Sequence, residues 1–535
     1  MSTQTEPSND TIASETMAAA SSAAAGIADL PEAGRSTEPA AAVEGSNSYD
    51  VPLPAGLAAA IAENWEPAPL MPHPAGRQID AIPRAVASFA RNRAALSAAF
   101  PDELIVVPAG VLKVRANDTD YAFRASSAFT WLTGETVEGA VLVLVPDRGG
   151  HAATLYVREY AGPGEVGYFT NRVYGALWVG NVPTVADTAT VLGVDVRPLS
   201  ELANDLRKSP GHPVLSLPRI DAEVDSLLPG SSGNPRNAKL AEVIDELRLV
   251  KDEWEIGQLQ VACDATTRGF TDVVSEIPAV LAAGGRRGER WLEGTFWRRA
   301  RMEGNEVGYT SIVGAGPHAT TLHWWRNDGD LAEGQLLLAD MGVEVDSLFT
   351  ADVTRTMPVS GEWTGAQRQL YGAVLEAQQA GIAEVKAGAD FLAAHKAAMW
   401  VIADHLHSWG VLPVTADVSC AEDIDAPGAG LHRRYTLHGV SHMLGLDVHD
   451  CAAARNETYR NGPLGAGYVV TVEPGLYFQP NDLSVPAEWR GIGIRIEDDI
   501  LVTDGAPRNL SAALPRDPDE IVAWMREAQS HPVTP

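Results

Sequence analysis

The sequence predicts an α+β protein in which a smaller N-terminal α/β domain precedes a larger C-terminal domain with a mostly antiparallel sheet. Its 535 residues are more than one hydrophobic core usually serves, so two or three domains are expected. Short β-rich runs and helical patterns occur in both halves of the chain. The polar stretch PGSSGNPRN, at 229–237, separates the halves and marks the expected domain boundary.

We therefore expect four segments. Residues 1–55 are rich in Ala, Ser and Glu, and such a segment buries too little apolar surface to offset its ordering entropy. We interpret them as a disordered tail. The other expected segments are an N-terminal α/β domain at 56–235, a C-terminal domain at 236–520 and a C-terminal tail at 521–535.

In the N-terminal domain, three short runs predict strands: LIVVPAG at 104–110, AVLVLVP at 140–146 and ATLYV at 153–157. In the C-terminal domain, apolar residues at helical spacing predict helices at 238–276, 289–303, 364–385 and 391–409. Four runs predict strands there: QLLLADMGVEV, SLFTADVTRTMPVSG, YVVTVEPGLYF and GIGIRIEDDILVT. Clustered strands with helices between them indicate an antiparallel α+β domain.

Composition excludes several classes of protein. The formal net charge of −30 leaves no basic surplus to neutralise phosphates, so we expect neither nucleic acid nor an anionic membrane as a partner. Three cysteines, far apart, form no disulfide framework or CxxC metal pair. No apolar run approaches the ~18 residues of a membrane helix, and the first residues lack the features of a signal peptide. A cytoplasmic enzyme is the resulting expectation.

The stretch HGVSHMLGLDVHD, at 438–450, holds three of the chain's 13 histidines. Its HxxxH spacing is similar to the metalloprotease motif HExxH, but Gly439 stands where that motif needs its general-base glutamate. Glycines at 439 and 445 also disfavour a helix, by roughly 1 kcal/mol each. The stretch is therefore not a self-contained zinc motif.

Four acids lie within apolar β-rich runs, where an unpaired carboxylate is costly: Asp340, Asp352, Glu473 and Glu497. Alternation along the last run places Arg495, Glu497 and Asp499 on one strand face. Arg355 and Arg495 are the few basic residues nearby, so bound cations are the natural source of positive charge.

The charge of this set favours a two-metal centre. Oxygen-rich ligands select hard or borderline divalent ions. Four carboxylates and one neutral histidine from the stretch 438–450 carry a formal charge of −4. Two divalent ions and one bridging hydroxide change this charge to −1. The metal-loaded set is thus close to neutral.

The ordered set Asp340, Asp352, His442, Glu473 and Glu497 resembles the ligands of the pita-bread metallopeptidases, which include methionine aminopeptidase, prolidase, creatinase and aminopeptidase P. Longer stretches are most similar to aminopeptidase P (Xaa-Pro aminopeptidase): YTSIVGAGPHATTLHWW, TADVTRTMPVSG, HGVSHMLGLDVHD, VVTVEPGLYF and RGIGIRIEDDI. The resemblance implies a pita-bread catalytic domain with a curved sheet. It also implies a metal-dependent aminopeptidase that releases the N-terminal residue when proline is second, by attack of a metal-bridging hydroxide on the Xaa-Pro bond.

The resemblance implies roles for single residues. Asp340 would bind one metal ion through both oxygens, Asp352 and Glu497 would bridge two ions, and His442 and Glu473 would complete the other site. The ions would be two Mn²⁺, and Glu473 would also accept and shuttle a proton. Asp352 lies twelve residues after Asp340, one more than in better-known relatives, and we place the extra residue in the turn around 344–347.

The resemblance also implies contacts to a proline-containing peptide from His323, His438 and His449, with His323 on the proline side. Tyr477 and Arg495 would orient the metal ligands, and Arg248 and Arg460 match further family arginines. Trp178, in ALWVG, would reach the active site of a neighbouring subunit, which predicts a homo-oligomer, either a dimer or a tetramer. Cys451 follows the histidine stretch, but no base is placed to activate it, so we interpret it as a small buried residue.

Two alternatives remain open. A prolidase, which cuts Xaa-Pro dipeptides, would share the metal chemistry, although Ser441 stands before the ligand histidine where prolidases have glycine. A metal-free relative, such as a creatinase-like hydrolase or a peptide-binding scaffold, would have lost ligands, and here all five are present.

Overall fold

The computed structural model describes residues 82–531, except 118, 163–164, 181–182, 209–210, 229 and 231–232. The disordered tail expected at 1–55 lies outside the described residues, as does the stretch 56–81. Among the described helices, none is both long enough and apolar enough to cross a membrane.

The N-terminal region is built on a five-stranded sheet in the order β6-β5-β4-β1-β7. β1, β4 and β5 pair antiparallel at its centre, and β6 and β7 add parallel strands at the edges. The three strands predicted from the sequence are therefore confirmed. The strands are β1 (Leu104–Pro108), β4 (Val141–Asp147), β5 (Gly150–Val157), β6 (Asp195–Pro198) and β7 (Val214–Ser216), with a separate ribbon of β2 (Val114–Ala116) and β3 (Thr119–Asp120).

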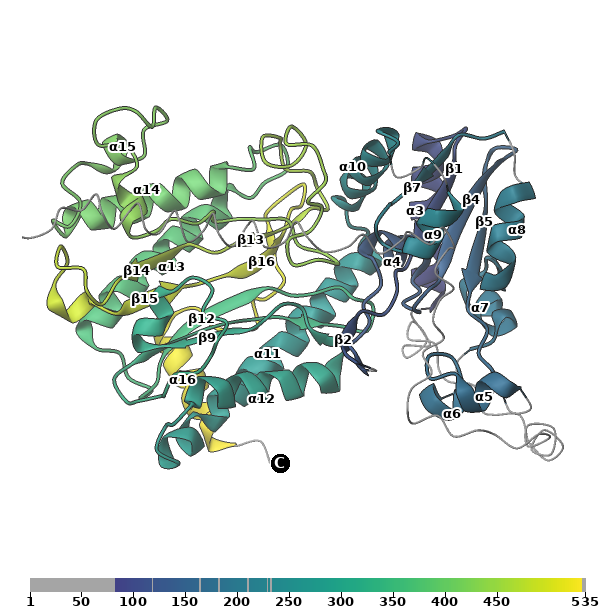
Figure 1. Cartoon of the computed structure of the whole chain (residues 1–535). Coiled ribbons are helices and arrows are strands. Elements are labelled where there is room, and N and C mark those ends of the chain that lie inside the picture. Colours follow the sequence, from purple (N-terminus) through teal and green to yellow (C-terminus); the bar gives the residue numbers. More distant parts are fainter. Residues whose placement is uncertain are drawn as a thin grey trace, which may run out of the picture. The chain divides into compact units, whose positions relative to one another are not determined.

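Alternation of side chains gives this sheet two buried faces. Ile105, Val107 and Leu142 belong to a core shared with α3 and α4, whereas Leu104 and Val106 pack with residues of α8 and α9 on the other face (Figure 1). The helices of this region are α3 (Ile82–Ala99), α4 (Ser127–Thr133), α5 (Val166–Thr170), α6 (Ala176–Val179), α7 (Val185–Leu192), α8 (Leu202–Lys208) and α9 (Ala222–Leu227).

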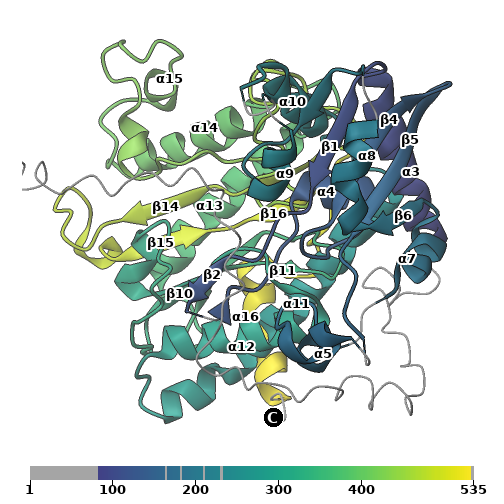
Figure 2. The ribbon, with the colours of Figure 1, turned by 45° about the vertical axis from the view of Figure 1, so that its right-hand side comes forward.

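The C-terminal region places short strands between two pairs of packed helices, α11 with α12 and α13 with α14 (Figure 1; Figure 2). The helices predicted at 289–303, 364–385 and 391–409 are confirmed as α12, α13 and α14. The helices are α10 (Arg236–Arg248), α11 (Glu253–Ala282), α12 (Gly288–Glu303), α13 (Gly365–Glu384), α14 (Ala393–Ser408), α15 (Ala416–Ser419) and α16 (Pro518–Ser530).

Every strand pair of this region that the structure describes is antiparallel, as the sequence predicts. The sheets are β12-β10-β9, β11-β8, β13-β16-β17 and β14-β15. The strands are β8 (Glu306–Val307), β9 (Ile312–Ala315), β10 (Leu336–Met341), β11 (Val343–Glu344), β12 (Val353–Pro358), β13 (Val469–Val472), β14 (Gly475–Phe478), β15 (Ile492–Arg495), β16 (Asp498–Leu501) and β17 (Arg508–Asn509).

The single helix predicted at 238–276 is wrong, because α10 ends at Arg248 and a second helix, α11, starts at Glu253 and ends at Ala282. Asp252 caps α11: its carboxylate accepts the N–H of Glu255, and the Glu255 side chain accepts the N–H of Asp252. Such a reciprocal capping box starts a new helix. Apolar spacing continues through this break, so periodicity alone does not reveal it.

The segment expected as a C-terminal tail, 521–535, is helical as far as Ser530, and residues 532–535 lie outside the described part of the chain. Asp517 caps α16, and Pro518 occupies its first turn. Ile521, Met525 and Ala528 are buried at the i, i+4, i+7 spacing of one helix face, and α16 packs against α11.

Candidate metal centre and active site

The C-terminal region contains a cavity of about 860 Å³. All five candidate metal ligands line it: Asp340, Asp352, His442, Glu473 and Glu497. His323, His438, His449, Arg460 and Arg495 also line it. The fold therefore brings residues from distant parts of the sequence to the wall of one cavity.

Asp340 and Asp352 come from two neighbouring antiparallel strands. Asp340 lies in β10 opposite Thr354 of β12, and Asp352 directly precedes β12. Asp352 is two residues from Thr354, so both aspartates fall on the same face of the ladder. The connection between them turns at Leu348, whose φ of 66° is left-handed. This turn lies outside the ladder of β10 and β12, and the extra residue expected there stays a prediction.

Glu473 and Glu497 lie at breaks in the ladder, and the single strands predicted over 468–478 and 491–503 are wrong in this respect. Glu473 separates β13 from β14, and Glu497 lies between β15 and β16. β13 pairs with β16 and β14 pairs with β15 in one unchanged antiparallel register, so the same two runs pair on both sides of an interruption at the two glutamates. Pro474, which lacks an N–H, cannot continue the ladder after Glu473.

The contacts of Arg495, Glu497 and Asp499 agree with the shared face expected from the sequence, since Arg495 and Glu497 contact Thr354 and Asp499 contacts Asp352. Arg495 and Glu497 line the cavity. The buried Asp499 carboxylate instead accepts the backbone N–H of Asp352 (3.1 Å) and the thiol of Cys263 (3.2 Å). Asp499 thus supports the segment that carries Asp352.

His442 is oriented by backbone groups. Its carbonyl accepts the N–H of Thr471, and its Nδ1 lies 3.1 Å from the carbonyl oxygen of Met443. An Nδ1–H donated to that oxygen leaves the Nε2 lone pair free for a metal ion. Nε2 lies 3.2 Å from Asp352 Oδ2 and 3.6 Å from Glu473 Oε1.

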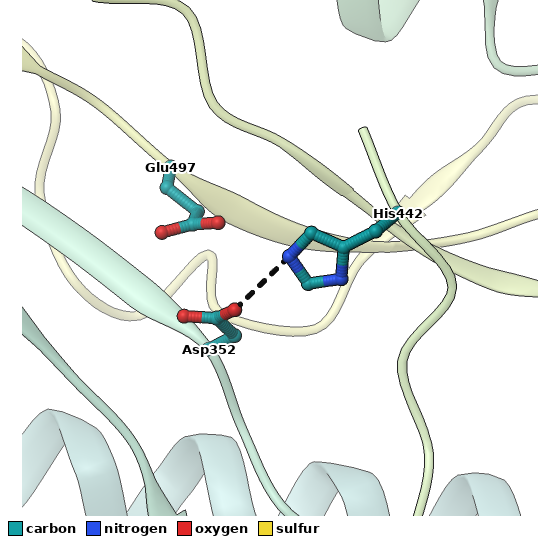
Figure 3. A group of neighbouring side chains, drawn as sticks. All are labelled: Asp352, His442 and Glu497. Carbon is teal, nitrogen blue, oxygen red and sulfur yellow. Dashed lines mark ion pairs between the residues drawn. The ribbon is translucent and has the colours of Figure 1, made fainter. Parts of the chain in front are cut away.

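Asp352, His442 and Glu497 bring one potential ligand atom each to within 4.8 Å of one another (Figure 3). Figure 3 shows the three side chains converging from separate segments, with the Asp352–His442 contact dashed. Carboxylate oxygens and an imidazole nitrogen at this spacing suit a divalent cation. Asp340 and Glu473 line the same cavity beside this trio.

The carboxylates repel one another in this buried setting. Burial and the neighbouring carboxylates raise the pKa of Glu497 well above its usual range. Burial also raises the pKa of Asp340, although the Arg495 guanidinium opposes it, and raises the pKa of Glu473 to about 7. Burial lowers the pKa of His442, but Asp352 and Glu473 outweigh it and raise that pKa to about 9. Such a cluster of acids is satisfied by bound cations.

Arg495 and Tyr477 connect a candidate metal ligand to a histidine. Arg495 Nη2 donates to Asp340 Oδ2 (2.5 Å), and its Nη1 lies 3.1 Å from the Tyr477 hydroxyl. That hydroxyl lies 2.8 Å from His438 Nε2. Burial, followed by the charge of Arg495, lowers the pKa of His438 to about 4, so the imidazole is neutral at physiological pH.

The other candidate site residues divide into two groups. His449 lies beside His442, with ring centroids 4.5 Å apart, and His323 lines the cavity at an exposed position. Trp178 and Arg248 do not line the cavity. Trp178, on α6, is 47% exposed and lies beneath the Arg172 guanidinium. Its expected contact with a neighbouring subunit stays a prediction.

Three residues were not predicted from the sequence, although they contact the candidate metal ligands or the loop 315–329 that carries His323. The Tyr309 hydroxyl donates to Asp340 Oδ1 (2.7 Å), and the Thr354 hydroxyl donates to Glu497 Oε2 (2.7 Å). Thr354 has the same strand parity as Asp352, which is a usable signal, and Tyr309 opens one of the stretches that resemble the family. The third is Glu289 on α12, which no motif marks.

Cys451 is buried beside Asp450, and burial raises the pKa of its thiol well above the usual range. The residue has a left-handed φ of 58° and donates its S–H to Asp450 (3.2 Å). A thiol in this setting is a poor nucleophile.

Two family models match the chain. Metallopeptidase family M24 matches residues 257–504, and the aminopeptidase P N-terminal domain matches residues 89–212. A curated relative, "Xaa-Pro aminopeptidase 1" of Streptomyces coelicolor, is 50% identical over 439 residues, which cover 82% of this chain and 87% of the relative. The chain belongs to the aminopeptidase P family.

Other members of the aminopeptidase P family agree with this placement. The Xaa-Pro aminopeptidase of Escherichia coli K12 is 30% identical over 82% of this chain and 98% of its own length. The solved structure of E. coli aminopeptidase P with the inhibitor Pro-Leu superposes with a TM-score of 0.72, at 30% identity, covering 83% of this chain and 99% of that one. The chain therefore has the pita-bread fold of this family.

Membership in the M24 metallopeptidases makes the chain a hydrolase that uses a divalent metal. The cluster of Asp352, His442 and Glu497 provides suitable ligands.

Proposed function

We propose that the chain is an Xaa-Pro aminopeptidase that releases the N-terminal residue of peptides with proline in second position. One observation carries the proposal: five family ligand positions and three histidines line one cavity, in a chain that is 50% identical to a relative named for this activity. The relatives are named aminopeptidases rather than prolidases, which favours the longer substrates.

Asp340, Asp352, His442, Glu473 and Glu497 would hold two Mn²⁺ ions, with Asp352 and Glu497 shared between them. The donor set fits, because it combines three buried carboxylates and the partly buried Glu473 with one imidazole whose other nitrogen is hydrogen-bonded. When bound, the ions generate a nucleophile from water at neutral pH and polarise the scissile carbonyl.

The remaining residues would bind, orient and move protons. Glu473 would accept the proton that the attacking water loses, since burial raises the pKa of its carboxyl to about 7. Its carboxylate lies between His438 Nδ1 (3.5 Å) and His442 Nε2 (3.6 Å). His449 would contact the scissile carbonyl from beside His442. His323 would line the proline side of the cavity.

Asp340 would be held in its ligand position by two hydrogen bonds. Arg495 donates to one of its carboxylate oxygens and Tyr309 to the other. Such contacts fix the orientation of a metal-binding carboxylate.

We propose a homo-oligomer in which Trp178 contributes to a neighbouring active site. Leu177, Trp178 and Val179 are each about half exposed on α6, and such a run of exposed apolar side chains suits a subunit contact. Light scattering of the purified protein tests this, and a monomer of full activity contradicts it. The cytoplasmic location expected from the sequence stays a prediction.

Purified protein supplied with Mn²⁺ should cleave Ala-Pro-Ala and release alanine. The dipeptide Ala-Pro should be a poorer substrate, and the opposite order would support a prolidase. Cleavage of only non-prolyl peptides contradicts the proposal.

Variants should separate metal ligands from substrate contacts. Asp352→Asn and Glu497→Gln should lose bound metal and at least ~10³-fold in activity, because each removes a shared ligand. His323→Ala should bind metal as the wild type does and lose activity through substrate binding. Metal content by elemental analysis checks the difference, and equal metal loss in His323→Ala contradicts these assignments.

A further inference from the structure

The loop that carries His323 into the cavity is organised by one buried carboxylate, Glu289, in the first turn of α12. Its Oε1 accepts the backbone N–H of Ala315 (2.8 Å) and lies 2.7 Å from His318 Nδ1. Its Oε2 accepts the indole N–H of Trp324 (2.8 Å) and the backbone N–H of Gly329 (2.6 Å). Glu289 therefore fixes both ends of the loop 315–329 and side chains within it.

Only a carboxylate satisfies this arrangement. Each oxygen of Glu289 faces a backbone N–H, so an amide in its place would direct its NH₂ group at a donor in either orientation. A buried donor left without an acceptor is destabilising. The loop is thus held by an interaction that Gln does not reproduce.

Two adjacent tryptophans in this loop have opposite environments. Trp324 stacks on His318 with ring centroids 3.9 Å apart and carries the Arg326 guanidinium over its ring. Trp325 lines the cavity and remains 63% exposed. The backbone N–H of Trp325 donates to the His323 carbonyl (2.9 Å), so the two cavity-lining residues lie within one tight turn.

We propose that Trp325 binds the side chain of the residue that follows proline, preferring an apolar or aromatic one, and that Glu289 is the positioning residue for this contact. The proposal rests on the proposed function, in which His323 lies on the proline side of the cleaved bond. Trp325 lines the same cavity within the turn of His323 and is exposed, so its indole is available to the part of the peptide that extends beyond proline.

An exposed indole gains from covering an apolar side chain, and an aromatic pair adds a specific contribution. The preference for Ala-Pro-Phe over Ala-Pro-Gly in kcat/KM should therefore be about 5- to 10-fold in the wild type. In Trp325→Ala the ratio should fall close to unity, with the loss confined to Ala-Pro-Phe.

Trp297→Ala is the matched control. Trp297 is 50% exposed on α12 and does not line the active-site cavity, so its removal should leave the Phe-to-Gly ratio unchanged. Both tryptophans are exposed, so neither substitution should prevent folding.

The outcomes for Trp325 and for the proposed function are distinguishable. A wild-type ratio near unity, or an unchanged ratio in Trp325→Ala, overturns the inference even though cleavage of Ala-Pro-Gly still supports the proposed function. Failure of the wild type to cleave any Xaa-Pro peptide overturns the proposed function itself.

Glu289→Gln tests the positioning role. It should raise KM for Ala-Pro-Phe about 10-fold, leave kcat within about 2-fold and retain the metal content, because the loop loosens while the metal ligands stay in place. Glu303→Gln is the control: this glutamate ends α12 and contacts Arg268 and Arg299 rather than the loop, so neither constant should change. An unchanged KM in Glu289→Gln, or a loss of metal, contradicts the positioning role.

Discussion

Asp450 carries a buried negative charge one residue after His449. It forms ion pairs with two buried cations, Arg248 and Lys251, and the Lys251 Nζ lies 3.1 Å away. Burial alone raises the pKa of Asp450, but Arg248 and then Lys251 outweigh it and lower the pKa to about 2. The charges therefore hold the turn that follows the cavity-lining histidines.

The lowered pKa of Asp450 makes its contribution to stability depend on acidity. An unfolded aspartate titrates near ~3.9, so the contribution is complete above that pH and is lost as the pH falls toward the folded pKa. Between pH 5 and pH 3 the wild type should lose about 1 kcal/mol of unfolding free energy through this group. Urea titrations at several pH values, compared with Asp450→Asn, measure the difference.

Asp450→Asn itself should lose about 3–5 kcal/mol of unfolding free energy at pH 7, because two buried cations lose the negative charge with which they pair. The stability gap between wild type and variant should then narrow as the pH falls from 5 to 3. A gap that stays constant or widens contradicts the ion-pair assignment.

The candidate metal ligands can be chosen from the sequence one by one, because each acid stands in an apolar run and the family pattern gives their order. Thr354 shares its strand parity with Asp352 and could be found in that way, whereas the contact of Tyr309 with Asp340 is made only in three dimensions. Glu289 is also hard to find from the sequence, because two of its partners are backbone N–H groups and such contacts leave no residue pattern.

For helices and strands, periodicity predicts where they exist better than where they are interrupted. The apolar runs around Glu473 and Glu497 are continuous in sequence, yet the ladder between them is interrupted at both glutamates. At the interruption the Glu473 N–H donates to the Val440 carbonyl and the Glu497 N–H to the Thr354 carbonyl. These acceptors lie in other segments, so the local pattern does not reveal the break. The break at Asp252 is different, since its capping box with Glu255 is visible in the sequence.

The helix α16 should be part of the cooperative fold. Ending the chain after Asp517 removes Ile521 and Met525, which are fully buried and worth about 1.5–3 kcal/mol each. It also removes the Pro518 carbonyl that accepts the indole N–H of Trp363 (3.0 Å). The truncated chain should lose about 4 kcal/mol of unfolding free energy in urea denaturation.

A chain ending at His531 is the control for this truncation, because it retains every residue of α16. It should unfold at the same urea concentration as the full chain. Equal stability of the two truncated chains would show that α16 contributes nothing.

Across the chain as a whole, residues before the catalytic region contact the loop that carries the histidines. Arg124 donates to Glu344 Oε2 (2.7 Å) and to the Leu446 carbonyl (2.5 Å), and the Ser127 hydroxyl donates to Asp447 Oδ1 (2.6 Å). The loop that leads to His449 is therefore held by the N-terminal region as well as by α10. The same contacts therefore stabilise the fold and hold the active-site loop in place.

Metal binding should consequently stabilise the entire fold. The buried ligand carboxylates come together only in the folded chain, and a ligand at 100 times its Kd adds about 2.7 kcal/mol when it binds the folded state alone. For a chain of this size that corresponds to a rise in Tm of about 3 °C. Calorimetry of the metal-free protein, before and after Mn²⁺ is added, measures the shift. Asp352→Asn should lose most of it, whereas His323→Ala should keep it. An absent shift in the wild type, or a full shift in Asp352→Asn, contradicts a metal centre built on these carboxylates.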